Sequence, residues 1–289
     1  MPTSTREILR VLEPSFMPTI SIDESPLAPT VSPVEIYFRE TGSGKPLIFL
    51  HGGWGYQVYP FNSQIEAFGA EYRIVIPDRT GYGRSLRIKE FPIDFHLRAA
   101  REVKRFIEAL GIDRPILWGH SDGAVIAVLM ALSDPDSYSA LILEAFHFYK
   151  DKPGSSEFFE TMAKNPDGLG PRVSETLTAD HGEDYWRELI INNGLAWLKI
   201  AESSSNEYED LYEGQLGNLK VPAIFIHGSR DPRTEPGELD AVRHQLPDAP
   251  IYMIEGGGHS PHSESQSAEE CNRIAGDFLT RLVNQHRRA

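Results

Sequence analysis

The sequence predicts an α/β protein built on a mostly parallel sheet that helices cover on both faces. Two observations predict this class. Short apolar runs of strand length recur along the chain, and segments with helical spacing of apolar residues lie between them. Most of the runs are apolar at every position, which is typical of strands buried on both faces. With 289 residues, the chain has room for two domains or for one larger α/β unit with an insertion.

Seven segments fit strands of such a sheet. Residues 34–38 alternate between apolar and polar side chains, and the turn residues Gly42, Ser43 and Gly44 follow them. The remaining six segments are continuously apolar, and they are residues 47–50, 74–76, 116–118, 141–143, 223–226 and 251–254.

Three helices are expected between and after these strands. Residues 97–110 carry apolar side chains on one face, and Gly111 is suited to end that helix. Residues 123–132 are apolar on every side, which indicates a helix buried against the sheet. Residues 267–285 form the last expected helix.

Composition divides the chain into three parts. Residues 1–33 contain several prolines that argue against helix, so we expect an extended or loosely packed N-terminal arm. Residues 34–146 and 218–289 carry the strand and helix pattern of the core. Residues 147–217 break the alternation with helical patches, many aromatic side chains and no clear strand. Insertions at strand ends commonly form lids over active sites.

Charge and composition exclude several classes of function. Lys and Arg number 28 against 42 Asp and Glu, a net charge of −14, so a nucleic-acid-binding surface is not expected. The chain holds no apolar stretch near the roughly 18 residues of a membrane span and no recognisable signal peptide. We therefore expect a cytoplasmic protein. Its single cysteine, Cys271, excludes a disulfide framework and a thiolate zinc cluster.

The segment 119–123 has the pattern G-x-S-x-G between an expected strand and an expected helix. This context is the one required of a nucleophile elbow. The sharp turn lifts the Ser121 hydroxyl clear of the sheet, and Gly119 and Gly123 avoid side-chain clashes with the neighbouring strand and helix. The sequence thus predicts Ser121 as a nucleophile at the amino end of a helix.

A serine nucleophile needs a base and a group that orients the base. Asp231 and His259 follow two later strands, in the chain order expected after such an elbow. We assign Asp231 as the orienting acid and His259 as the base. Glu144, at a strand end, is a weaker candidate for the acid.

Two further histidines receive structural interpretations. His120 adjoins the nucleophile and is expected to point away from the reaction. His262 could pair with His259 as a metal ligand, but no fitting cysteine or carboxylate accompanies them. We therefore predict no metal site and place His262 on the turn after His259.

The oxyanion of the attack needs two preorganised N–H donors. One is the backbone N–H of Asp122, directly after the nucleophile. The loop 51–55 is expected to supply the second from Gly53 or Trp54, and the sequence leaves the choice open. Trp54 is also a candidate wall of the pocket.

From about Val34 onward the chain resembles proteins of the α/β-hydrolase fold. The resemblance rests on the elbow, on His51-Gly52, on residues 78–85 (DRTGYGRS) and on Gly258-His259. It implies an eight-stranded, mostly parallel sheet, a helical cap inserted after the sixth strand, where residues 147–217 fall, and no cofactor. Epoxide hydrolases and dehalogenases of this fold carry aspartate where this chain has Ser121, which disfavours both activities.

The expected function is hydrolysis of an acyl compound, most simply a carboxylic ester, through an acyl-enzyme on Ser121. The aromatic cap favours a small hydrophobic substrate. Three alternatives remain open: an amino-acid ester or amide, with the amine bound by the Asp122 side chain as in proline-iminopeptidase-like relatives; a carbon–carbon bond; and a non-catalytic ligand receptor on the same fold. The sequence does not fix the oligomeric state.

Overall fold

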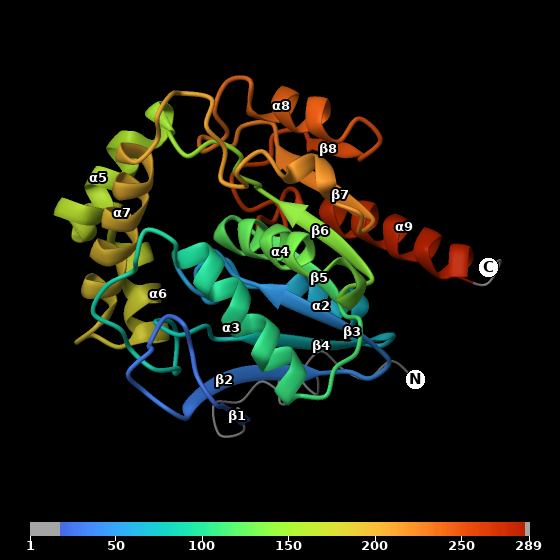
Figure 1. The fold of residues 1–289 in the computed structure, drawn as a ribbon, viewed down its shortest axis with the longest axis horizontal. Helices are drawn as coiled ribbons and strands as arrows, with labels where there is room; N and C mark the ends of the chain where they lie inside the picture. Colours follow the sequence, from blue (N-terminus) through green and yellow to red (C-terminus); the bar gives the residue numbers. More distant parts are fainter. Residues whose placement is uncertain (1–17, 287–289) are drawn as a thin grey trace.

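The computed structural model describes residues 18–286, and these form one eight-stranded sheet with helices on both faces (Figure 1). The strand order is β1-β2-β4-β3-β5-β6-β7-β8, and all pairs from β4 to β8 are parallel. The fold class predicted from the sequence is therefore confirmed. The strands are β1 (Thr19–Ile22), β2 (Val34–Thr41), β3 (Lys45–Leu50), β4 (Tyr72–Pro77), β5 (Ile116–His120), β6 (Ala140–Glu144), β7 (Ala223–Gly228) and β8 (Ile251–Ile254).

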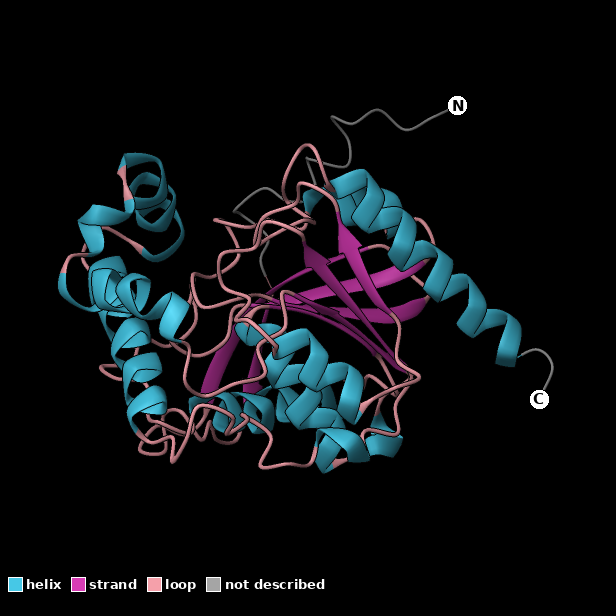
Figure 2. Cartoon of the chain, turned by 90° about the horizontal axis from the view of Figure 1, so that it is seen from above, coloured by secondary structure: helices cyan, strands magenta, loops and turns pink. Residues whose placement is uncertain are grey.

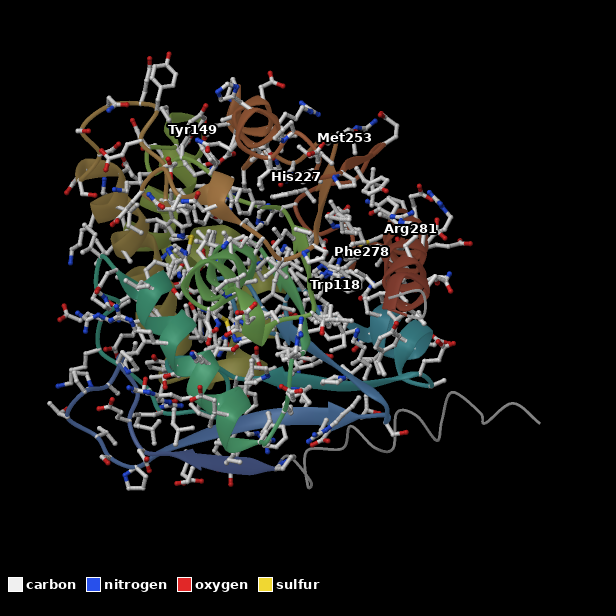
Figure 3. All side chains as sticks on the ribbon, turned by 45° about the vertical axis from the view of Figure 1, so that its right-hand side comes forward. Trp118, Tyr149, His227, Met253, Phe278 and Arg281 are labelled. Carbon is white, nitrogen blue, oxygen red and sulfur yellow. The ribbon has the colours of Figure 1, made fainter. Side chains whose placement is uncertain are left out.

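Two apolar layers cover the sheet. On one face, α3 (Phe95–Ala109) and α4 (Asp122–Ser133) share one hydrophobic cluster, which Val242 of α8 (Glu238–Gln245) joins. On the other face, α2 (Asn62–Phe68) and α9 (Ala268–His286) share a second cluster. Phe278 of α9 and Trp118 of β5 belong to this second cluster and lie near each other in Figure 3. Every residue of β5 and β6 is buried, as the apolar runs at residues 116–118 and 141–143 predict for those positions.

Three longer helices follow β6 and stand beside the sheet rather than on its faces (Figures 1 and 2). They are α5 (Ser156–Lys164), α6 (Pro171–His181) and α7 (Trp186–Glu202); one short 3-10 helix precedes α5 and another lies between α5 and α6. A buried ion pair connects the start of this segment to α8: Lys152 Nζ lies 2.6 Å from Oε1 of Glu238. The same carboxylate accepts the backbone N–H of Phe148 at 2.6 Å.

Part of the extended arm expected over residues 1–33 joins the sheet as a strand. Residues 1–17 lie outside the described part of the chain, but β1 pairs antiparallel with β2 and forms the edge strand that sequence analysis did not locate. Ser25 is buried and donates a hydrogen bond to Glu102 of α3. Four-residue β1 is too short to show a period, so the prolines elsewhere in residues 1–33 dominated the prediction.

Two further helices, α2 and α8, were not predicted from the sequence. They span seven and eight residues, too few turns to establish a helical period. Within residues 18–286, none of the helices combines the length and the apolar character needed to cross a bilayer.

Candidate active site

Ser121 occupies a strained turn between β5 and α4. Its backbone angles are φ 53° and ψ −121°, a conformation that non-glycine residues rarely adopt. A side chain at Gly119 would collide with the Gly123 carbonyl, and one at Gly123 would collide with the Leu50 carbonyl of β3. The two glycines therefore permit the close approach of strand and helix that the elbow pattern requires.

The structure brings Ser121, His259 and Asp231 together. His259 Nε2 lies 3.1 Å from Ser121 Oγ, and His259 Nδ1 lies 2.9 Å and 3.0 Å from the two carboxylate oxygens of Asp231. Burial alone would raise the pKa of Asp231, but the charge and hydrogen bond of His259 outweigh it and lower the pKa below its usual value. Asp231 is therefore ionised at neutral pH and orients the imidazole.

Two side chains hold the loop that carries His259. His120 Nε2 lies 3.1 Å from the His259 carbonyl oxygen and 2.9 Å from Ser260 Oγ. Glu264 accepts the backbone N–H groups of Gly258 at 2.8 Å and Ser260 at 3.1 Å. Burial, and to a lesser extent the nearby His262 and His259, lowers the pKa of His120 to about 3, so this ring stays neutral. His120 thus supports the position of His259 without contacting Ser121 through a hydrogen bond.

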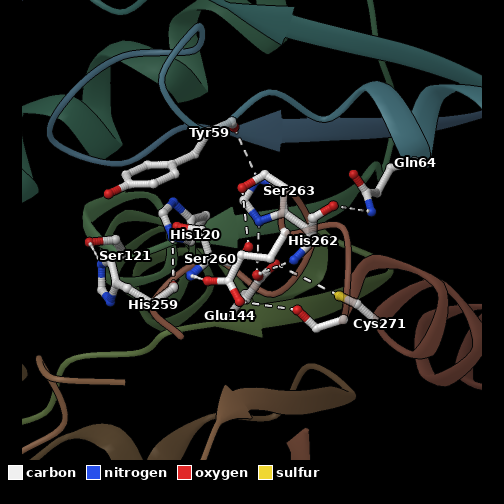
Figure 4. A network of polar contacts seen from close by, with 12 residues as sticks. Tyr59, Gln64, His120, Ser121, Glu144, His259, Ser260, His262, Ser263 and Cys271 are labelled. Carbon is white, nitrogen blue, oxygen red and sulfur yellow. Dashed lines mark hydrogen bonds and ion pairs between the residues drawn. The ribbon is translucent and has the colours of Figure 1, made fainter. Parts of the chain in front are cut away.

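Glu144 and His262 form a separate buried pair. Glu144 Oε1 lies 2.8 Å from His262 Nδ1 and accepts the His262 backbone N–H at 3.0 Å. Figure 4 shows this pair on one side of the network and Ser121 with His259 on the other, with His120 and Ser260 between them. The Glu144 carboxylate thus pairs with His262 and not with His259, so the sequence alternative that made Glu144 the acid for His259 is wrong. The rings of His259 and His262 also have different partners and do not converge as metal ligands would.

The loop after β3 lies against the nucleophile. A Cβ at Gly52 would sit 3.1 Å from Ser121 Cβ, and one at Gly53 would sit 2.7 Å from Asp122 Oδ2. In the described part of the chain, no hydrogen bond uses the backbone N–H of Gly53, Trp54 or Asp122 as its donor. All three are available as oxyanion donors, and the choice between Gly53 and Trp54 stays open.

Asp122 lines the cavity, but its carboxylate, which one sequence alternative assigned to a substrate amine, already has protein partners. Its carboxylate lies 3.1 Å from His96 Nε2 and accepts the Trp197 indole N–H at 3.1 Å and an Asn193 amide N–H at 3.4 Å. Only 2% of this side chain is exposed. These partners come from α3 and α7, whose approach to the elbow the local sequence does not reveal, and they weaken the support for that alternative.

His147 is a site residue that sequence reasoning missed. Its Nε2 lies 3.1 Å from Ser121 Oγ, the same distance as His259 Nε2. Burial, together with the Lys152 charge, lowers the pKa of His147 well below its usual value, so the ring is neutral. Its position just after the carboxyl end of β6 was the available signal, because parallel sheets gather functional side chains there.

A cavity of about 210 Å³ opens over Ser121. Its polar lining includes His147, His259 and the guanidinium-bearing Arg233. The apolar lining comes from the loop after β3 and from the helices beside the sheet: Trp54, Tyr59, Phe158, Phe159, Met162 and Trp197. Aromatic side chains of the predicted cap therefore contribute directly to the pocket wall.

Comparison with known proteins places these features in context. A sequence model described as the alpha/beta hydrolase family matches residues 47–274. The serine hydrolase BPHL of Homo sapiens is 24% identical over 257 residues, covering 86% of this chain and 84% of that protein. A 2-hydroxy-6-oxononadienedioate/2-hydroxy-6-oxononatrienedioate hydrolase of Paraburkholderia phymatum is 27% identical over 271 residues, covering 85% and 91%.

Solved structures share the same fold. A thermophilic esterase from Thermogutta terrifontis superposes with a TM-score of 0.69 at 22% identity, covering 92% of this chain and 99% of that one. An E-2-(acetamidomethylene)succinate hydrolase superposes with a TM-score of 0.66 at 16% identity, covering 92% and 100%. The range of the sequence-model match, residues 47–274, includes the segment that contains α5, α6 and α7.

Proposed function

Because the chain belongs to the alpha/beta hydrolase family, we propose that it is a serine hydrolase that cleaves a carboxylic ester through Ser121, His259 and Asp231. One observation carries the proposal. His259 Nε2 lies 3.1 Å from Ser121 Oγ while both oxygens of Asp231 lie within 3.0 Å of His259 Nδ1. This arrangement supports a general base that accepts the serine proton and a carboxylate that fixes its tautomer.

The reaction begins when Ser121 Oγ attacks the ester carbonyl carbon and its proton passes to His259 Nε2. The negative charge that develops on the carbonyl oxygen is stabilised by the N–H of Asp122 and an N–H of Gly53 or Trp54. His259 then gives its proton to the departing alcohol, which leaves an acyl group on Ser121. A water molecule, deprotonated by His259, attacks this acyl group and releases the carboxylic acid.

The pocket wall favours a small substrate with a hydrophobic portion. Phe158, Phe159 and Trp197 line the cavity above Ser121 and give it an apolar wall. We propose that residues 147–217 act as the cap that closes this cavity and that residues 34–146 and 218–289 form the catalytic core. These boundaries accord with the position of α5 to α7 beside the sheet.

Carbon–carbon bond hydrolysis is the second candidate function. The relative from Paraburkholderia phymatum, whose name describes hydrolysis of a 2-hydroxy-6-oxo-dienedioate, supports it. Recognition of an amino-acid ester by Asp122 has weaker support, because its carboxylate already contacts three donors. If the protein is instead a non-catalytic receptor, we expect it to bind a ligand without converting it.

A substrate panel tests the proposal. Purified protein is assayed with short and long acyl esters, aromatic esters, amino-acid amides and a ring-fission dienone, alongside its Ser121→Ala variant. We expect turnover of at least one ester class, and Ser121→Ala should abolish it. Turnover of the dienone with no ester hydrolysis would favour the second candidate, and inactivity on the whole panel would favour the receptor.

A further inference from the structure

An arginine cation lines the active-site cavity without a carboxylate partner. Arg233 is two residues beyond Asp231, whose Oδ1 accepts its backbone N–H at 2.8 Å. Among the described residues, the Arg233 guanidinium forms neither an ion pair nor a hydrogen bond, and it rests over the Phe158 ring. Its five N–H donors therefore have no protein acceptor among the described residues, and the side chain lines the cavity.

The carboxylates of Asp231, two residues before Arg233, and of Glu264, in the same cavity lining, already have other partners. Asp231 holds His259, and Glu264 accepts the backbone N–H groups of Gly258 and Ser260. No other Lys or Arg lines the cavity in the part of the chain that is described. Burial lowers the pKa of Arg233 to about 10, so the side chain still carries its charge at neutral pH.

Tyr59 supplies a second unused donor in the same cavity. Within the described residues its hydroxyl has no hydrogen-bond partner, and Figure 4 shows the hydroxyl end directed to the Ser121 side. Burial raises the pKa of Tyr59 to about 12, which keeps the hydroxyl protonated and able to donate. Tyr59 and Arg233 both line this cavity.

A chain of ring contacts connects these donors around the cavity. Trp54 stacks on Tyr59 with centroids 5.8 Å apart, and Trp54 also contacts Phe158 at 5.5 Å, beneath the Arg233 guanidinium. Tyr59 in turn contacts the His259 ring at 6.4 Å. Both donors are thus held in the wall that also contains the proposed base.

We propose that Arg233, assisted by the Tyr59 hydroxyl, binds a carboxylate of the substrate, so that the substrate is an acyl compound with a hydrophobic body and a second, anionic end. This inference rests on the proposed hydrolase function. A planar guanidinium fits a carboxylate through paired N–H···O bonds. In a protein with a net charge of −14, such a local cation offsets the general repulsion of anions.

A matched pair of esters tests this proposal. Mono-4-nitrophenyl adipate and 4-nitrophenyl hexanoate have the same chain length and leaving group but differ in the terminal carboxylate. The ratio of kcat/KM for the charged ester over the neutral ester is measured for the wild type, Arg233→Gln, Arg233→Lys and Arg230→Gln. Arg230 is exposed in the same loop and outside the cavity, so it is the charge-matched control.

We expect Arg233→Gln to lower this ratio by about ten- to a hundredfold, the usual worth of a hydrogen bond to a charged group. Arg233→Lys should lower it less, and Arg230→Gln should leave it unchanged. An unchanged ratio in Arg233→Gln overturns the proposal. An equal loss on both esters does so too, because it assigns Arg233 to packing against Phe158.

Binding to an inactive protein separates this inference from the hydrolase function. Calorimetry with the Ser121→Ala protein compares monomethyl adipate with methyl hexanoate, and the same comparison is made in Ser121→Ala carrying Arg233→Gln. Tighter binding of the carboxylate that requires Arg233 supports the proposal even if the wild type hydrolyses neither ester. Equal affinity of the two ligands for the Ser121→Ala protein overturns it.

Discussion

The Nε2 atom of His147 lies 3.1 Å from Oγ of Ser121, the same separation that His259 Nε2 has. The other ring nitrogen of His147 is buried and has no hydrogen-bond partner among the described residues. A proton on Nε2 can therefore be shared with Ser121 Oγ, whereas a proton on Nδ1 would be left without an acceptor. The neutral His147 ring is thereby placed to donate to the serine and to turn its hydroxyl proton toward His259.

Substitution of His147 should slow the reaction without changing which group acts as the base. We expect His147→Phe to lower kcat by about tenfold, because one hydrogen bond that orients the nucleophile is lost. His147→Gln, which keeps an N–H donor, should recover part of the rate. The pH at which activity falls on the acid side should stay the same in both variants. A loss as large as that of His259→Gln would instead make His147 a base.

Asp231 rather than Glu144 is expected to determine catalysis. Asp231→Asn should lower kcat by roughly a thousandfold or more, since the amide no longer fixes the reactive tautomer of His259. Glu144→Gln should keep most of the activity and instead destabilise the protein, because Glu144 holds the buried His262. Steady-state kinetics and urea unfolding of both variants check this. Comparable kinetic losses in the two variants would contradict the assignment.

The sequence predicted the sheet and the elbow more completely than the surroundings of the serine. Gly119 and Gly123 are local signals, because their role depends on a turn a few residues long. The roles of His147 and Asp122 depend on contacts with Ser121, His96 and Trp197 that lie 26 to 75 positions away in the chain. Such contacts follow from how helices dock on the sheet, and no local period encodes them.

Asp122 is expected to contribute more to stability than to substrate recognition. Asp122→Ala leaves the buried donors of His96, Trp197 and Asn193 without an acceptor, so the free energy of unfolding should fall by about 2–4 kcal/mol. The exposed Asp113→Ala is the control and should change little. Urea unfolding measures both. If Asp122→Ala is as stable as the wild type but loses activity on amino-acid esters alone, the carboxylate binds an amine after all.

His227 should make the protein less stable in acid. Its two ring nitrogens have no partners among the described residues, and burial lowers its pKa to about 4. The unfolded chain, with an ordinary pKa near 6.5, binds the proton first as the pH falls. This residue therefore costs about 1.4 kcal/mol of stability per pH unit between roughly pH 6.5 and 4.

Replacement of that histidine by an apolar side chain should remove its part of the pH dependence. His227→Leu is expected to unfold at higher urea concentration than the wild type at pH 5, with a smaller difference at pH 8. Urea unfolding at both pH values makes the comparison. A difference that is the same at the two pH values would show that His227 does not titrate as its burial implies.

Covalent labelling of Ser121 tests the central proposal most directly. The protein is treated with a fluorophosphonate, and intact-mass and peptide mass spectrometry locate the adduct in the wild type, Ser121→Ala and His259→Gln. We predict one adduct per chain on Ser121, none in Ser121→Ala, and labelling at least about a hundredfold slower in His259→Gln. An unlabelled wild type, or equal labelling rates with and without His259, would contradict a serine activated by this histidine.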